Sequence, residues 1–204
     1  MAGPHQIWQM QLETGIVQTY AGTGAEACVD GSFTESVFAQ PSGIASDGKE
    51  LFVADSEVSS IRSVGLGKQQ VRTVCGSGDL FGFGDVDGVG EQVRLQHCLG
   101  VEYAQNYLWV ADTYNHKIKL VSPHSGNCQT VLGDSTAGLQ DAQGQNSRFS
   151  EPSGLSLIDS YLYIADTNNH AIRRVELDTL SVTTLHFPGL CAPDACIPPE
   201  VATT

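Results

Sequence analysis

The chain has 204 residues, with 23 acidic against 10 basic side chains and a net charge of −13 at neutral pH. Non-specific nucleic-acid binding requires a cationic surface, so this balance argues against it. Residues 1–25 contain no cationic start followed by an apolar segment, and no run of about 18 apolar residues occurs. We therefore expect a soluble protein of the cytosol.

One phrase occurs three times along the chain: Leu-Phe-Val-Ala-Asp at 51–55, Leu-Trp-Val-Ala-Asp at 108–112 and Leu-Tyr-Ile-Ala-Asp at 162–166. A glycine lies 12 residues before each aspartate, and an isoleucine lies 6 residues after it. The aspartates are Asp55, Asp112 and Asp166, the glycines Gly43, Gly100 and Gly154, and the isoleucines Ile61, Ile118 and Ile172. Self-similarity of this kind indicates a repeat architecture.

Each unit contains four short apolar runs separated by turn-forming residues. In the last unit the runs are 153–157, 161–165, 171–175 and 181–185. Runs of about five residues between turn formers are typical of strands, and four antiparallel strands per ~40–50 residues are typical of a β-propeller blade. In the third run of the middle unit, Lys117 and Lys119 alternate with Ile118 and Leu120, which predicts a strand with one wetter face.

The sequence thus predicts an all-β fold, an incomplete β-propeller of about three and a half four-stranded blades. The expected divisions are the second half of a blade at 5–20, blades at 33–75, 90–132 and 144–186, and a proline-containing tail at 187–204. Since propellers close with about four to eight blades, we expect an open arc with exposed faces and edges that can self-associate. We interpret the chain as a piece of a longer protein; two copies completing one ring is the alternative.

The stretches 110–118 and 164–172 read Val-Ala-Asp-Thr-Tyr-Asn-His-Lys-Ile and Ile-Ala-Asp-Thr-Asn-Asn-His-Ala-Ile. They resemble NHL repeats, and the resemblance covers roughly residues 5–186. It implies a propeller of the NHL type, and full-length relatives with a thioredoxin-like domain before the propeller. The first full blade departs from the pattern, with Val58 and Ser59 at the Asn-His positions, so we expect its turn to close differently.

The repeated aspartates suggest an active site, because carboxylates at equivalent strand ends could ring one opening. We favour a structural role, since an aspartate that ends a strand accepts hydrogen bonds from N–H groups of the following turn. The same reasoning applies to the Asn-His pairs at 115–116 and 169–170, which we expect to hydrogen-bond across the second turn.

A metal-dependent hydrolase or lyase is the first alternative function, because related propeller enzymes hold calcium or zinc in the central channel. Such a site needs carboxylate, amide or imidazole groups on the innermost strands, where only Glu102 could serve. The Asp-Val-Asp-Gly segment at 85–88 lacks the further acids of a calcium loop. We therefore expect no enzymatic activity, no metal and no cofactor.

The connections 21–40, 76–97 and 133–151 are expected on the same face as the turns that follow each second strand. Ten acidic residues lie in these connections: Glu26, Asp30, Glu35, Asp79, Asp85, Asp87, Glu91, Asp134, Asp141 and Glu151. Only Arg94 and Arg148 oppose them. An RNA-binding propeller, as found among some relatives, is therefore only the second alternative.

A protein partner on this acidic face is the expected function. Phe81 and Phe83 alternate with glycines where the middle unit is longer, and aromatic residues on such a loop are plausible anchors. Tyr114 and Asn168 follow the second strands on the same face. The alternative for the two phenylalanines is that they fold back over the neighbouring blade as a cap.

The six cysteines do not predict a repeated disulfide framework, because those of the repeats occupy different positions. We expect Cys75 and Cys128 to be small buried hydrophobic residues. Cys191 and Cys196, with four residues between them in the tail, could oxidise to a disulfide.

Overall fold

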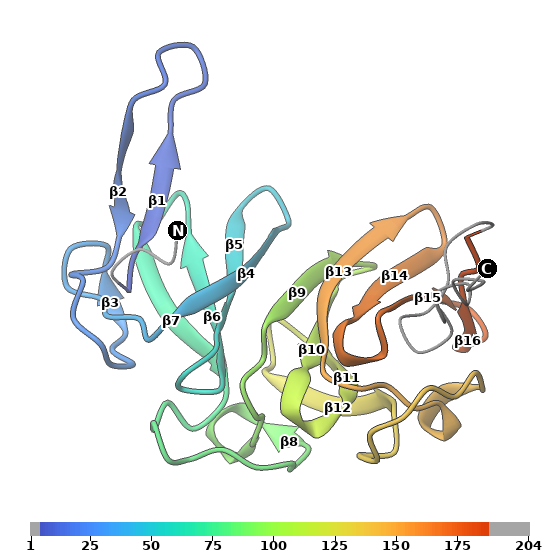
Figure 1. Ribbon diagram of the computed structural model, residues 1–204. Coiled ribbons are helices and arrows are strands. Elements are labelled where there is room, and N and C mark those ends of the chain that lie inside the picture. Colours follow the sequence, from blue (N-terminus) through green and yellow to red (C-terminus); the bar gives the residue numbers. More distant parts are fainter. Residues whose placement is uncertain (1–4, 188–204) are drawn as a thin grey trace, which may run out of the picture.

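The structure, a computed structural model, describes residues 5–187 and consists of antiparallel sheets placed side by side along an arc (Figure 1). Strands are joined by turns and short 3₁₀ segments, and no α-helix occurs in the part of the chain that is described. The predicted all-β propeller class is confirmed. Cys191 and Cys196 lie outside the described residues.

Four sheets make up the arc. The N-terminal hairpin pairs β1 (Ile7–Met10) with β2 (Val17–Ala21). Blade 1 has the order β3 (Gly31–Ser32), β7 (Gln70–Cys75), β6 (Ser60–Gly65), β5 (Glu50–Asp55), β4 (Pro41–Ser46). Blade 2 has the order β8 (Gly88–Val89), β12 (Asn127–Leu132), β11 (Lys117–Val121), β10 (Tyr107–Asp112), β9 (Gly100–Ala104). Blade 3 runs β13 (Pro152–Ile158), β14 (Tyr161–Asp166), β15 (Ala171–Glu176), β16 (Ser181–Thr184).

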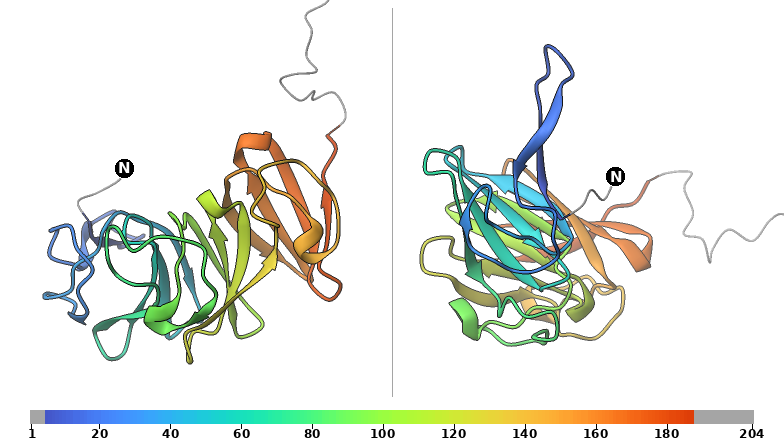
Figure 2. Two further views of the ribbon diagram at one scale, coloured as in Figure 1. Left: turned by 90° about the horizontal axis from the view of Figure 1, so that it is seen from below. Right: turned by 90° about the vertical axis from the view of Figure 1, so that its left-hand side faces the viewer.

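The connections between blades lie on one side of the arc, at the bottom of Figure 1, whereas the N-terminal hairpin and the turns joining β4 to β5 and β13 to β14 point to the other side (Figure 2). The turns η2 (Thr113–Asn115) and η4 (Thr167–Asn169) follow β10 and β14, and η1 (Gly90–Gln92) and η3 (Gly144–Asn146) lie within the connections. We call the side that carries these connections and turns the loop face.

The apolar core lies between neighbouring sheets. Phe52 and Ile61 of blade 1 share a buried cluster with Leu108 and Val110 of blade 2. A second cluster joins blade 2 to blade 3, and a third joins the N-terminal hairpin to blade 1. Burial of these side chains against the next sheet is the main stabilising contribution that holds the arc together.

Blade 3 shows what happens to the repeated isoleucine when no further sheet of the described residues, 5–187, covers it. Ile61 and Ile118 are fully buried between blades, whereas Ile172 at the same repeat position is 37% exposed. The face of blade 3 that turns away from blade 2 is therefore an uncovered equivalent of a blade-to-blade surface.

The repeated glycines let the innermost strands approach each other closely. A Cβ atom at Gly100 of β9 would overlap the carbonyl oxygen of Ser153 in β13, and one at Gly43 would lie 2.7 Å from the carbonyl oxygen of Leu99. At Gly154, which has no further inner strand beside it in the described part of the chain, the Cβ would meet only Ala165, at 3.7 Å. The glycine is thus required by the neighbouring blade rather than by its own strand.

The loop face as a candidate interaction site

Each repeated aspartate is fully buried and holds the connection that precedes its own blade. The bonds run from the N–H groups of Ala39, Gln96 and Ser150 to Oδ1 of Asp55, Asp112 and Asp166, at 2.7, 2.6 and 2.7 Å. The predicted donors of the following turn are present in two blades, where the side-chain amides of Asn115 and Asn169 donate to Oδ2 of Asp112 and Asp166, both at 2.8 Å. The backbone donors from the preceding connection were not predicted. The antiparallel pairing of the first two strands brings residues 16 positions earlier to the aspartate, which a local turn motif does not reveal.

A buried cation stands seven residues after each aspartate. In blade 3, Arg173 Nη1 donates to Asp166 Oδ2 at 2.7 Å and Nη2 donates to Asp141 Oδ1 at 2.9 Å. Arg62 makes the same two contacts in blade 1, with Asp55 at 3.0 Å and Asp30 at 2.9 Å. Each guanidinium also donates to two backbone carbonyls of its connection, so the cost of burying the charge is offset by several charge-assisted bonds.

Blade 2 uses lysine at this position, and Lys119 does not lie on a wetter face of β11 as the alternation predicted. Its side chain is fully buried, with Nζ 2.8 Å from both Asp85 Oδ1 and Asp87 Oδ1 and 3.7 Å from Asp112 Oδ2. The prediction was wrong because it treated lysine as a solvated residue. Three carboxylates from outside the strand supply its counter-charge.

The type of the buried cation matches the type of the apolar residue beside it: arginine occurs with phenylalanine, and lysine with leucine. The guanidinium of Arg62 lies over the ring of Phe38 at 5.1 Å, and that of Arg173 over the ring of Phe149 at 4.9 Å. Blade 2, with lysine, has Leu95 at the position of the phenylalanine and the additional carboxylate of Asp85. An arginine stacks on an aromatic face more readily than a lysine does, which accounts for the pairing.

The network continues to the outermost strand of each blade. The N–H of one threonine donates to the acid of the connection in every blade, at 2.9, 2.8 and 3.0 Å for Thr73–Asp30, Thr130–Asp87 and Thr184–Asp141. Sequence reasoning missed this cation–threonine–acid network. The signal was present, since the acid lies 25 before, the cation 7 after and the threonine 18 after the aspartate in all three blades.

The Asp85–Gly88 segment binds ammonium groups of the same chain. Besides Lys119, Lys117 Nζ donates to Asp85 Oδ2 at 2.6 Å. Burial would raise the pKa of Asp85, but the hydrogen bonds from the two lysines outweigh it and lower the pKa to about 2. Between residues 5 and 187, no three carboxylate, imidazole or thiol groups converge as the ligands of a metal would.

On the innermost strands, Glu102 is the acid that sequence reasoning singled out. Burial raises the pKa of its carboxyl group, and the backbone N–H groups of Tyr103 and Leu157 partly counteract this by hydrogen bonding. Its environment is therefore shaped by strands β9 and β13, and a single carboxylate of this kind offers one ligand to a cation.

The loop face is less acidic than the count of its residues suggests. Asp30, Asp85, Asp87 and Asp141 face the buried cations, and Asp134 pairs with Arg148 at 2.8 Å. The remaining five acids make no ion pair within the described residues: Glu26, Glu35, Asp79, Glu91 and Glu151. The uncompensated charge therefore depends on these five side chains.

Phe81 stands out from the loop face on a structured loop. Its side chain is 84% exposed, and that of Phe83 is 49% exposed. The loop is held by bonds from Ser77 Oγ to the Gly82 carbonyl at 3.1 Å and from the Phe81 N–H to Asp79 Oδ1 at 2.9 Å. Phe81 does not cap a neighbouring blade. We call residues 77–84 the aromatic loop.

Tyr114 belongs to the same neighbourhood, whereas Asn168 does not. The side-chain amide of Asn115 donates to the Gly84 carbonyl at 2.6 Å, which joins η2 to the aromatic loop, and Tyr114 beside it is 46% exposed. Asn168 is exposed at the equivalent position of blade 3, where its N–H donates to the carbonyl of Ser150 at 3.0 Å. The structure thus joins the turn of Tyr114 to the aromatic loop, whereas Asn168 lies in blade 3.

The Asn-His pairs were expected to hydrogen-bond across the second turn. The asparagines do so, through their bonds to the repeated aspartates, whereas His116 bonds to the next blade instead. Nδ1 of His116 accepts a bond from the Glu151 N–H at 3.1 Å. In blade 1, Ser59 replaces the imidazole, and its hydroxyl accepts from the His97 N–H at 3.1 Å. Both residues have left-handed backbone angles, φ 56° for His116 and 47° for Ser59, but no 3₁₀ segment forms in the turn after β5.

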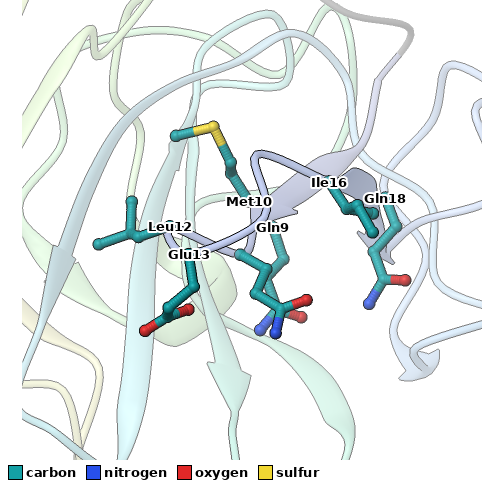
Figure 3. Close-up of a pocket in the computed structure, with 7 residues that line it drawn as sticks. Gln9, Met10, Leu12, Glu13, Ile16 and Gln18 are labelled. Atoms are coloured by element: carbon teal, nitrogen blue, oxygen red, sulfur yellow. The ribbon is translucent and has the colours of Figure 1, made fainter.

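Away from the loop face, a hollow of about 380 Å³ lies at the tip of the N-terminal hairpin (Figure 3). Gln9, Met10, Leu12, Ile16 and Gln18 line it together with Glu13 and Gln11. Glu13 is its one ionisable side chain, so the hollow offers neither an acid–base pair nor an activated nucleophile.

Two comparisons with known proteins concern sequence. No family model matches the chain. The chloroplastic protein SUPPRESSOR OF QUENCHING 1 of Arabidopsis thaliana is 41% identical over an alignment of 206 positions, which covers 95% of this chain and 20% of that protein. NHL repeat-containing protein 2 is 41% identical over 222 residues in Bos taurus and 40% over 210 residues in Homo sapiens. These matches cover 97% and 91% of the chain but only 30% and 29% of the relatives.

The third comparison concerns solved structures. An auxiliary nutrient binding protein from Bacteroides thetaiotaomicron superposes with a TM-score of 0.67 at 18% identity, over 91% of this chain and 44% of that one. One from Bacteroides ovatus gives 0.58 at 13% identity, over 87% and 46%. At these identities the likeness concerns the fold alone.

Antiparallel sheets of about four strands, packed face to face along an arc, define this chain as a β-propeller protein. The repeats and the relatives specify it further. The chain belongs to the NHL-repeat proteins, and it is similar to NHL repeat-containing protein 2 over nearly its whole length.

Proposed function

We propose that the chain is a non-catalytic interaction module of a larger protein of the cytosol, and that it binds a protein partner through the loop face. The observation that carries the proposal is the 84% exposure of Phe81 on a loop fixed by its own hydrogen bonds. A large aromatic side chain kept in water costs free energy that a partner recovers by covering it, and a fixed loop loses little entropy on binding.

The two other functions have weaker support on this face. An RNA-binding surface needs free cations, yet Arg148 pairs with Asp134 and Arg94 donates to the carbonyls of Glu91 and Val93 at 2.6 and 2.8 Å. A metal-dependent enzyme needs converging ligands, and the described residues contain no such group of three. No helix of the described part is long and apolar enough to span a membrane.

Double substitution of Phe81 and Phe83 by serine tests the proposal. We expect a partner captured from a cytosolic extract by the parent chain to be lost from the variant, because the apolar anchors are gone. Tyr107→Ser is the matched control, since this aromatic residue is 44% exposed on the opposite side of blade 2. Circular dichroism should show the same strand content for all three proteins.

Chelation separates the proposal from the enzyme alternative. Treatment with a chelator should leave capture unchanged. Capture that survives the double substitution but disappears with the chelator would move the function to a metal site and contradict the proposal.

A further inference from the structure

A groove of about 310 Å³ opens beside the aromatic loop, between blade 1 and blade 2. Asp30 and Thr73 form its wall on blade 1, Ser77 and Gly78 form its rim, and Glu91 of η1 forms the wall on blade 2. Because Ser77 Oγ donates to the carbonyl of Gly82, the rim of the groove and the exposed phenylalanines are parts of one fixed surface.

The groove stays open at Gly78, where the rim has no side chain. A Cβ atom at Gly78 would lie 3.0 Å from Cys28 Sγ, so a larger residue there would close the gap between the two sides. Gly76 and Gly90, which also line the groove, are joined by a backbone hydrogen bond of 3.1 Å at its floor. A groove of this volume has room for one long side chain.

The charge of the groove selects a cation. Two carboxylates, those of Asp30 and Glu91, line it, and no lysine or arginine does. Asp30 is committed to Arg62 and Thr73 but its side chain remains 50% exposed, whereas Glu91 makes no ion pair within the described residues. Asp79 on the aromatic loop adds a third acid, and the guanidinium of nearby Arg94 is turned towards backbone carbonyls.

We propose that this groove receives a lysine or arginine side chain from an extended, basic segment of the partner protein, while a neighbouring apolar residue of the segment packs on Phe81. The inference rests on the proposed function and names the chemistry of the partner. Long basic side chains bury an apolar stem and keep the charge at a carboxylate, which is what the groove and the carboxylate of Glu91 provide.

A peptide pool tests the inference on the full chain. The probe is a mixture of N-acetylated, C-amidated nonapeptides with a fixed central leucine and randomised flanking positions. We expect the parent chain to enrich peptides with lysine or arginine close to the leucine. Fluorescence anisotropy then measures one enriched peptide against the variants.

Glu91→Lys should lower the affinity for that peptide about fivefold, because the attraction between an exposed carboxylate and the basic side chain, up to about 1 kcal/mol, is lost. Glu13→Lys is the matched control: it makes the same change in net charge at the exposed tip of the N-terminal hairpin and should change nothing. The serine double variant of Phe81 and Phe83 should weaken binding about tenfold or more.

The outcomes separate the inference from the proposed function. Enriched peptides that show no preference for lysine or arginine, but still depend on the phenylalanines, would overturn the inference and leave the function standing. The absence of any enriched peptide would also overturn it, while capture of a folded partner through Phe81 would still uphold the function. Enrichment of acidic peptides would overturn it directly.

Discussion

At the scale of single residues, the charges that matter most for this fold are hidden. Arg173 has no exposed side-chain surface, and its guanidinium bridges the carboxylates of Asp166 and Asp141. Removing one partner of such a pair leaves the other charge buried without compensation, which costs far more than the pair contributes when intact. The repeated aspartate is therefore a requirement for folding in every blade.

Asp166→Ala should lower the free energy of unfolding by about 3–5 kcal/mol, because the buried guanidinium of Arg173 and the N–H of Ser150 would lose their hydrogen-bond acceptor. Urea titration followed by intrinsic fluorescence measures the change. Asp178→Ala, at an exposed turn, should change it by less than about 0.5 kcal/mol. A variant of Asp166 that unfolds like the parent but loses partner binding would refute the structural role.

In blade 2, Asp112 and Asp85 should make folding stability depend on pH in opposite directions. Burial raises the pKa of Asp112 to about 6 from 3.8, whereas the lysines lower that of Asp85 to about 2. The folded state therefore holds the Asp112 proton more tightly, and stability from this group declines as the pH rises from about 4 to 6. Stability from Asp85 is present above pH 3.8 and declines as the pH falls towards 2.

Unfolding measured from pH 2 to 7 checks both signs. Asp112→Asn should flatten the stability profile only between about pH 4 and 6, and Asp85→Asn only below about pH 4. A profile of Asp85→Asn that keeps the full acid decline would show that its bonds to the lysines contribute nothing to the difference between folded and unfolded states.

At the scale of elements, the sequence predicted strands better than contacts. The runs 161–165 and 171–175 became β14 (Tyr161–Asp166) and β15 (Ala171–Glu176), because apolar runs between turn formers are a local signal. The burial of Lys119 and the backbone donors to the aspartates were not predicted, because the residues that interact lie 16 to 34 positions apart in the sequence. Phe81 was singled out because it lies where the middle unit is longer than the others, but only the folded chain shows that Asn115 joins its loop to the turn that carries Tyr114.

The inner-strand glycines offer a matched pair of substitutions. Gly100→Ala should destabilise the chain by about 1–3 kcal/mol, because its Cβ would overlap the Ser153 carbonyl of the next blade. Gly154→Ala, at the same repeat position, has only Ala165 at 3.7 Å and should be tolerated. Thermal unfolding of both variants measures the difference. Equal losses would mean that the glycine serves its own strand.

At the scale of the whole molecule, the arc has stronger contacts inside than at its ends. Three buried clusters join the four sheets, yet the outward face of blade 3 leaves Ile172 37% exposed. The inner edge of β1, too, has no paired strand within the described residues. Uncovered apolar faces and free strand edges favour association with another molecule.

We expect the isolated chain to self-associate at micromolar concentration. Ile172→Lys should shift sedimentation towards the monomer, because it places a charge on the uncovered face of blade 3. Ile158→Lys is the control, because this residue is 56% exposed at the end of β13. It should leave the sedimentation of the chain unchanged. A stable, cooperative monomer of the parent chain would contradict the expectation.

The bond between each buried aspartate and the preceding connection limits how often the loops of the loop face can open. Loop amides usually exchange their hydrogens with solvent through small local openings, but those of Ala39, Gln96 and Ser150 are held by carboxylates at strand ends inside the protein. Releasing one of them requires the buried ion pair to open, and with it the blade. The loops beside the aromatic anchors therefore share the lifetime of the sheets, and a partner meets a surface already set before it arrives.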